Sequence, residues 1–141
     1  MAKSRIKGIT VEINGDVTGL DKALSAVNSR IEDTRSQLKE VERGLRFNPG
    51  NTELLEQRQR LLGEAVKATS EKLAALREAE KQAQEQFERG EISQAEYEAL
   101  RREIIKTEDQ LKKLEKQAER EEAQRQKAAE RRNERKEPDS S

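Results

Sequence analysis

The sequence predicts an all-α protein: an elongated antiparallel coiled-coil arrangement of three helices, preceded by one short N-terminal β-strand. Of its 141 residues, 41% are charged, 31% are hydrophobic and 2% are aromatic, which is typical of long helices. Apolar residues recur at alternating spacings of three and four, and two short breaks interrupt them. Full disorder has a similar composition, but a disordered chain has no reason to keep this spacing over four heptads.

The first segment, residues 1–16, differs from the rest of the chain. Three β-branched residues alternate with polar ones, which is the period of a half-buried strand: Ile9, Val11 and Ile13. Asn14-Gly15-Asp16 then indicates a turn. The sequence offers no evident second strand, so we expect these three residues to form a partner strand. It would pair with the same strand of a neighbouring copy or with the sheet edge of another protein.

The helical module is expected over residues 17–118, and its first helix over about 18–46. Thr18 is expected to cap this helix, with Asp21 in the first turn. Four heptads follow without interruption: Leu20, Leu24, Val27, Ile31, Thr34, Leu38, Val41 and Leu45. Pro49 and Gly50 break the helix, and so short a connection favours an antiparallel hairpin.

The second helix is expected over about 52–89, with Asn51 or Thr52 as its cap. It carries two neighbouring stripes. One holds Leu55, Leu62, Val66, Thr69, Leu73, Leu76, Ala83 and Phe87, and the other Leu54, Leu61, Ala65, Ala68, Ala75 and Ala79. Two stripes indicate two neighbours, as expected of the middle helix of three.

The third helix is expected over about 94–118. Gly90 suits the end of the preceding helix, Ser93 and Glu96 form a capping box, and Ile92 can pack onto Tyr97. After Ala118 only alanines and charges continue, which predicts a charged helical extension over 119–141 that ends in a frayed tail at 138–141.

The apolar seams of the three helices can meet. The seam residues that we expect to form the core are Leu24, Ile31, Leu38, Leu45, Leu62, Leu73, Leu76, Leu100, Ile104, Leu111 and Leu114. Threonines recur at inward positions 34, 69 and 107, where they either set the register or are tolerated. The seams leave the oligomeric state open. They also leave open whether the helices fold back on one another or extend as a rod.

The composition argues against an enzyme. The chain has no histidine and no cysteine, and its carboxylates lie beside Lys and Arg on helix faces. We therefore predict no catalytic, cofactor-binding or metal-binding residues, and no cofactor. Lys plus Arg and Asp plus Glu both number 29, which is unlike a nucleic-acid binder. The basic cluster Arg131, Arg132, Arg135 and Lys136 is balanced by acidic neighbours, so a solvated helix is favoured. No apolar run approaches the roughly 18 residues that span a membrane, and no signal-peptide core is present.

Several stretches resemble the N-terminal region of phage tail tape measure proteins, especially those of long-tailed phages and prophages of Gram-positive bacteria. The stretches are "ITVEINGDVTGLDKALSAVN", "LKEVERGL", "NPGNTELL", "KLAAL" and "RGEISQAEYEALRREI", within about residues 6–118. The most specific are the strand-to-helix junction and the two loops.

The resemblance implies an elongated helical protein, present in several copies inside the tail tube, whose length sets the tail length. Tube subunits would assemble around it with the help of a tail-assembly chaperone, and tail-tip proteins would be neighbours. It would lie in the bacterial cytoplasm during assembly and in the virion tail afterwards. Proteins of this family usually run to many hundreds of residues, whereas this sequence stops at Ser141. We therefore expect a fragment, a truncated product or a relative that kept only the N-terminal module.

Two functions follow as expectations. The first is a structural assembly module of the tail, which associates with itself or with tail proteins through its strand and coiled coil. The alternative is a cytoplasmic coiled-coil adaptor or chaperone-like binding protein, or a short phage-encoded regulatory protein built on the same module.

Overall fold

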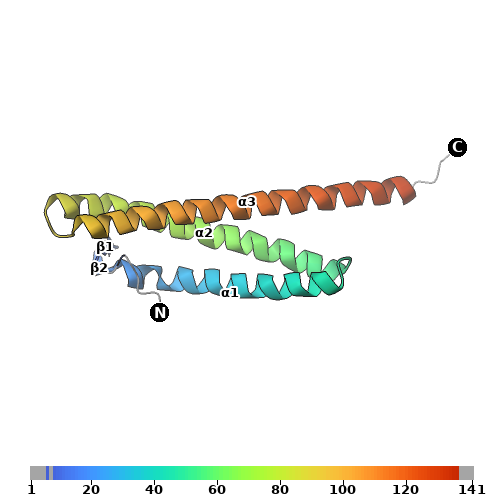
Figure 1. Cartoon of the computed structure of the whole chain (residues 1–141), viewed down its shortest axis with the longest axis horizontal. Helices are drawn as coiled ribbons and strands as arrows, with labels where there is room; N and C mark the ends of the chain where they lie inside the picture. Colours follow the sequence, from blue (N-terminus) through green and yellow to red (C-terminus); the bar gives the residue numbers. More distant parts are fainter. Residues whose placement is uncertain (1–5, 7, 137–141) are drawn as a thin grey trace.

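The protein is all-α with an N-terminal β-hairpin, as Figure 1 shows for the computed structural model, which describes residue 6 and residues 8–136. In chain order the elements are β1 (Thr10–Ile13), β2 (Asp16–Gly19), α1 (Leu20–Phe47), α2 (Thr52–Glu88) and α3 (Gln94–Lys136). The predicted fold class of three helices after an N-terminal strand is confirmed. The beginning of the expected segment 1–16 and the expected frayed tail at 138–141 lie outside the described residues.

The expectation that the strand has no partner within the chain is wrong. β1 and β2 form an antiparallel two-stranded sheet, in which Val11 lies opposite Thr18 and Ile13 opposite Asp16. Asn14 and Gly15 connect them with φ values of 53° and 86°, the left-handed pair that a tight two-residue hairpin turn requires. Asn-Gly is the dipeptide that adopts this turn most readily, so the reversal is local.

The hairpin also changes how α1 begins. Gly19 is the N-cap of α1 and no side chain caps the helix there, whereas Thr18 belongs to β2. The expected Thr18 cap is therefore wrong, because the strand continues to the first helical residue. Instead, the amide of Leu20 donates to the carbonyl of Ile9 at 2.9 Å, which ties the helix start to the hairpin.

The other two helix starts follow the sequence. Asn51 caps α2, with its side-chain oxygen accepting from the amide of Leu54 at 2.9 Å. Before α3, the hydroxyl of Ser93 accepts from the amide of Glu96 at 3.1 Å, and the Glu96 carboxylate accepts from the amide of Ser93 at 2.8 Å. This is the reciprocal capping box that the sequence predicts.

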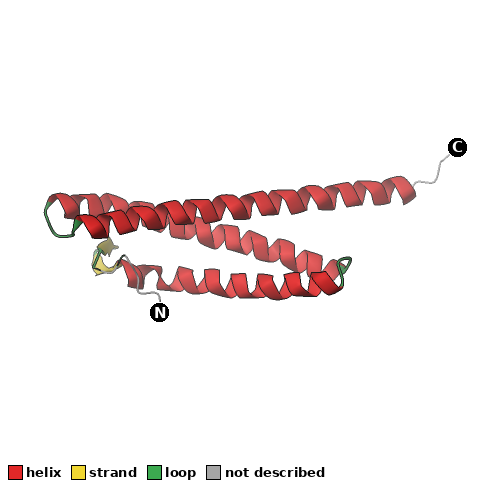
Figure 2. Ribbon diagram, in the orientation of Figure 1, coloured by secondary structure: helices red, strands yellow, loops and turns green. Residues whose placement is uncertain are grey.

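The three helices fold back on one another, and α2 is the middle helix. It packs against both α1 and α3, while no described Cα atom of α1 lies within 8 Å of one in α3. This confirms the expectation drawn from the two stripes of α2. The hairpin lies at the end of the bundle where α1 begins and α2 turns into α3 (Figure 2).

Two apolar clusters form the core. The first cluster joins the hairpin to all three helices, with Ile9 and Val11 packed among Leu20, Leu76 and Leu100. The second lies toward the α1–α2 loop and consists of Leu38, Val41, Leu45, Leu61, Leu62 and Ala65. Eight of the expected seam residues are buried, and Ile31, Leu111 and Leu114 are half-buried. The start of α3 is also anchored in the core. Ile92, just before it, is buried in the first cluster, and Tyr97 packs against this cluster.

Candidate functional site

The hairpin has two outer edges, and α2 closes one of them. The amide of Glu12 donates to Oε1 of Gln82 at 2.7 Å, and Nε2 of Gln82 donates to the carbonyl of Glu12 at 3.2 Å. One turn further along α2, Nε2 of Gln86 donates to the carbonyl of Thr10 at 2.7 Å. The two glutamine amides bind the backbone of β1 as a third strand would, so this edge is occupied.

The outer edge of β2 is open as far as the described residues are concerned. Because the two-residue turn makes Ile13 and Asp16 a hydrogen-bonded pair, the next pair, Glu12 and Val17, points its backbone groups outward on both strands. The bonds of Glu12 to Gln82 agree with this alternation. For Val17, by contrast, no described residue binds the outward N–H and C=O groups. Its side chain is 69% exposed, the most exposed apolar residue of the hairpin.

The three expected partner-strand residues have different environments. Ile9 precedes β1 and is 1% exposed, and Val11 is likewise buried in the first core cluster. Ile13, at the turn, is 49% exposed. Two of the three therefore anchor the hairpin to its own bundle. The open edge belongs to β2, whose residues are expected from the sequence only as a turn and a helix cap.

Gly8, just before the hairpin, lies close to the start of α3. Gly8 has φ +102°, and a Cβ atom there would lie 2.2 Å from Oε2 of Glu96. A side chain at this position would therefore meet the capping box as well as backbone strain. Ile9 is buried and its carbonyl accepts from the amide of Leu20, so the hairpin is tied to the bundle where α1 begins.

Polar contacts between the helices all include α2 in the described part of the chain. Lys72 pairs with Glu103 at 3.1 Å and Arg77 with Glu108 at 2.8 Å, both on α3. Arg30 of α1 pairs with Glu71. Nearer the C-terminal end of α3, Nε of Arg58 lies 2.9 Å from Oε1 of Glu121, and this is the most buried of these ion pairs. The two atoms are not aligned as a hydrogen bond.

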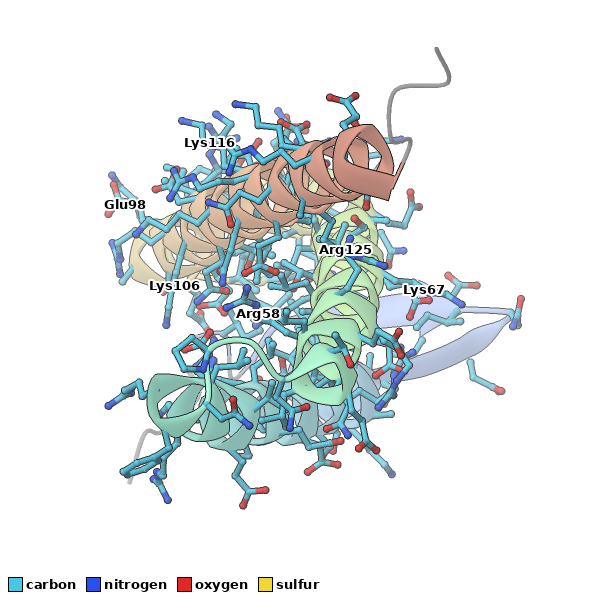
Figure 3. All side chains as sticks on the ribbon, turned by 90° about the vertical axis from the view of Figure 1, so that its right-hand side faces the viewer. Arg58, Lys67, Glu98, Lys106, Lys116 and Arg125 are labelled. Atoms are coloured by element: carbon cyan, nitrogen blue, oxygen red, sulfur yellow. The ribbon has the colours of Figure 1, made fainter. Side chains whose placement is uncertain are left out.

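An open groove of about 610 Å³ separates α1 from α3 near the α1–α2 loop. Its lining mixes charged, amide and apolar side chains: Glu42, Leu45, Arg46, Pro49, Leu55, Arg58, Gln117 and Gln124. Figure 3 shows this end of the bundle, with Arg58 between α1 and α3. A second hollow of about 560 Å³ lies between the hairpin and the end of α2, beside Gln82 and Gln86.

The ionisable groups whose pKa is shifted lie in pairs on the surface. The hydrogen bond from Arg30 lowers the pKa of the Glu71 carboxyl. Hydrogen bonds to carboxylates raise the pKa of Arg89, which binds Glu91, and of Arg101, which binds Glu80. All three shifts come from ion pairing, on helix faces for Glu71 and Arg101 and in the α2–α3 loop for Arg89, and they stabilise the charged forms that these groups already have at neutral pH.

No catalytic arrangement emerges from the described residues. They contain no group of three or more acidic side chains placed to hold a metal ion, and the chain has neither His nor Cys. Among the helices described, none is long and apolar enough to cross a membrane. Of the basic cluster noted in the sequence, Arg131 is exposed on α3, and the side chains of the other three residues lie outside the described part.

Comparisons with protein-family models, with curated proteins and with solved structures find no match.

Proposed function

We propose that this chain is a non-enzymatic structural module that acts by assembly, in the manner of the N-terminal region of a phage tail tape measure protein. The observation that carries the proposal is the outer edge of β2, which no described residue pairs with and which lies at one end of an elongated three-helix bundle (Figure 1). An unprotected edge presents backbone donors and acceptors ready to pair with another strand.

The resemblance to tape measure proteins supports the proposal in a specific way. The stretches that carry it coincide with chain reversals and helix starts: the Asn14-Gly15 turn, the Asn51 cap and the Ser93 capping box. Coiled-coil seams resemble one another through composition alone, whereas these junctions do not. The partners would be further copies of the chain, tail-tube and tail-tip proteins and a tail-assembly chaperone. The chain would lie in the host cytoplasm during assembly and in the virion tail afterwards.

The direct test is to purify tails from the bacterium that carries the gene and to probe them with an antibody to the chain. We expect the chain, alone or within a longer product, in intact tails and in tube assembly intermediates. Its presence in the cell extract and absence from purified tails would contradict the proposal.

One observation favours the alternative of an adaptor or chaperone-like binding protein. The groove between α1 and α3 has three apolar residues, Leu45, Pro49 and Leu55, among polar neighbours, and could hold a client segment. Substituting Leu55→Gln would then weaken client capture. The tail experiment separates the two functions, because a cytoplasmic adaptor would not remain in purified particles.

A further inference from the structure

The β2 strand, Asp16–Gly19, is only lightly protected for an exposed sheet edge, since it is four residues long and carries one charged residue, Asp16, beside the turn. Natural edges are blocked by lysines, prolines, bulges or a covering element. β2 has no lysine, proline or bulge, and its central side chain is the exposed Val17. On the other side of the same hairpin, Gln82 and Gln86 cover β1. The side chains of α2 therefore cover the β1 edge of the hairpin, whereas no described residue covers the β2 edge.

We propose that β2 pairs with β2 of a second copy of this chain, in antiparallel register about a two-fold axis at Val17. The proposal rests on the proposed function as an assembly module and names the partner of its open edge. Val17 of each copy would supply both its outward N–H and its C=O to Val17 of the other. The product is a four-stranded antiparallel sheet with the strand order β1, β2, β2 and β1.

The side chains favour this register. When Val17 lies opposite Val17, Asp16 of each copy lies opposite Thr18 of the other, which places a carboxylate acceptor beside a hydroxyl donor on both sides of the axis. A shift of one residue toward the turn would place the two Asp16 carboxylates opposite each other, and like charges in that position destabilise a sheet. Self-pairing also covers the exposed Val17 with an identical side chain.

The geometry leaves room for the second copy. Because β1 lies between α2 and β2, the outer edge of β2 faces away from α2. In the end-on view of Figure 3 the two pale blue strands extend outward past α2. A net charge of zero adds no long-range repulsion between copies.

Each four-residue strand contributes few hydrogen bonds, so we expect a weak dimer that depends on concentration. Isolated two-stranded ribbons are marginal in water, but here each hairpin is already anchored in its bundle. Several copies held side by side in one assembly would raise the local concentration and favour the pairing.

Cysteine cross-linking tests the pairing, because the chain has no cysteine of its own. Residues opposite each other in a hydrogen-bonded antiparallel pair have Cα atoms about 5.5 Å apart, within the range that a disulfide spans. Under a mild oxidant, Val17→Cys should form dimers at least about tenfold faster than Ile13→Cys, an exposed site on β1 of the same hairpin that the pairing does not bring together.

The register has its own test. A mixture of Asp16→Cys and Thr18→Cys chains should form the mixed dimer faster than either variant forms a dimer with itself. Equal rates for Val17→Cys and Ile13→Cys, or no preference for the mixed dimer, would overturn the proposal. Helical circular dichroism of each variant shows that the bundle is intact.

The outcomes separate this inference from the proposed function. If the chain is found in purified tails but Val17→Cys does not cross-link selectively, self-pairing is wrong and the assembly role stands. If cross-linking is selective but the chain is absent from tails, the pairing holds and the tail function is wrong.

Discussion

At the residue scale, two glutamines of α2 decide which edge of the hairpin is free. Gln82 and Gln86 bind backbone groups of residues that lie 70 and 76 positions earlier. Nothing in the sequence pattern marks them, because a glutamine on a charged helix is ordinarily a solvated side chain. Their role depends on where the hairpin packs, which is a tertiary feature.

Replacing Gln82 with alanine should expose the backbone of Glu12 to water. We expect the amide of Glu12 to exchange its hydrogen about tenfold faster, since its bond to Oε1 of Gln82 is lost. Gln84→Ala is the matched control, because Gln84 is an exposed residue on the same helix whose side chain binds no other described residue. Equal exchange rates at Glu12 in the two variants would show that Gln82 does not protect this edge.

Two apolar residues of α3 differ in burial and allow the core to be compared with the surface. Leu100 is fully buried in the first core cluster, whereas Ile105 is 52% exposed. Leu100→Ala should lower the free energy of unfolding by about 2–5 kcal/mol, because it removes buried methyl groups and leaves a cavity. Ile105→Ala should change it by less than about 1 kcal/mol. Urea unfolding followed by circular dichroism measures both, and similar losses would place Leu100 outside the core.

At the element scale, helices and loops were predictable and the hairpin was not fully so. Heptads fixed the extent of α1 and α2, and Asn51, Ser93 and Glu96 marked helix starts through local hydrogen bonds. β2 was missed because Asp16–Gly19 holds one apolar residue and no alternation. The Asn14-Gly15 dipeptide was the available signal, since it favours two-residue hairpins over other turns.

The start of α3 depends on the capping box of Ser93 and Glu96. Ser93→Ala removes the hydroxyl that accepts from the amide of Glu96, so we expect a loss of about 1 kcal/mol in the free energy of unfolding. Ser36→Ala, in the exposed middle of α1, is the control and should leave stability nearly unchanged. If the two variants unfold at the same urea concentration, the box contributes nothing to the helix start.

The ion pair between α1 and α2 predicts a pH dependence. Arg30 lowers the pKa of Glu71 in the folded protein, so the pair's contribution is present above the ordinary glutamate pKa and is lost as pH falls through the lowered value. We expect Glu71→Gln to be slightly less stable than the original chain at pH 7 and equally stable in strong acid. Urea unfolding at both pH values measures the difference in stability between the two chains. A difference that grows in acid would contradict the prediction.

At the scale of the whole molecule, the bundle is an open arrangement built on α2. Two stripes on one helix were enough to predict its middle position, because each apolar stripe needs a neighbour. The absence of close approach between described residues of α1 and α3 was beyond the sequence, since the seam pattern is equally compatible with a closed triangle. The open edge of β2 likewise emerged only from the packing of the hairpin against α2.

The most direct test of the assembly role is the solution mass, measured by light scattering over a series of concentrations. We expect the mass to rise from one chain toward two with increasing concentration, and Val17→Lys to keep the mass of one chain with unchanged helicity. Ile13→Lys, on the other strand, should behave like the original chain. A single-chain mass at every concentration would contradict self-assembly through β2, and so would a dimer that Val17→Lys leaves intact.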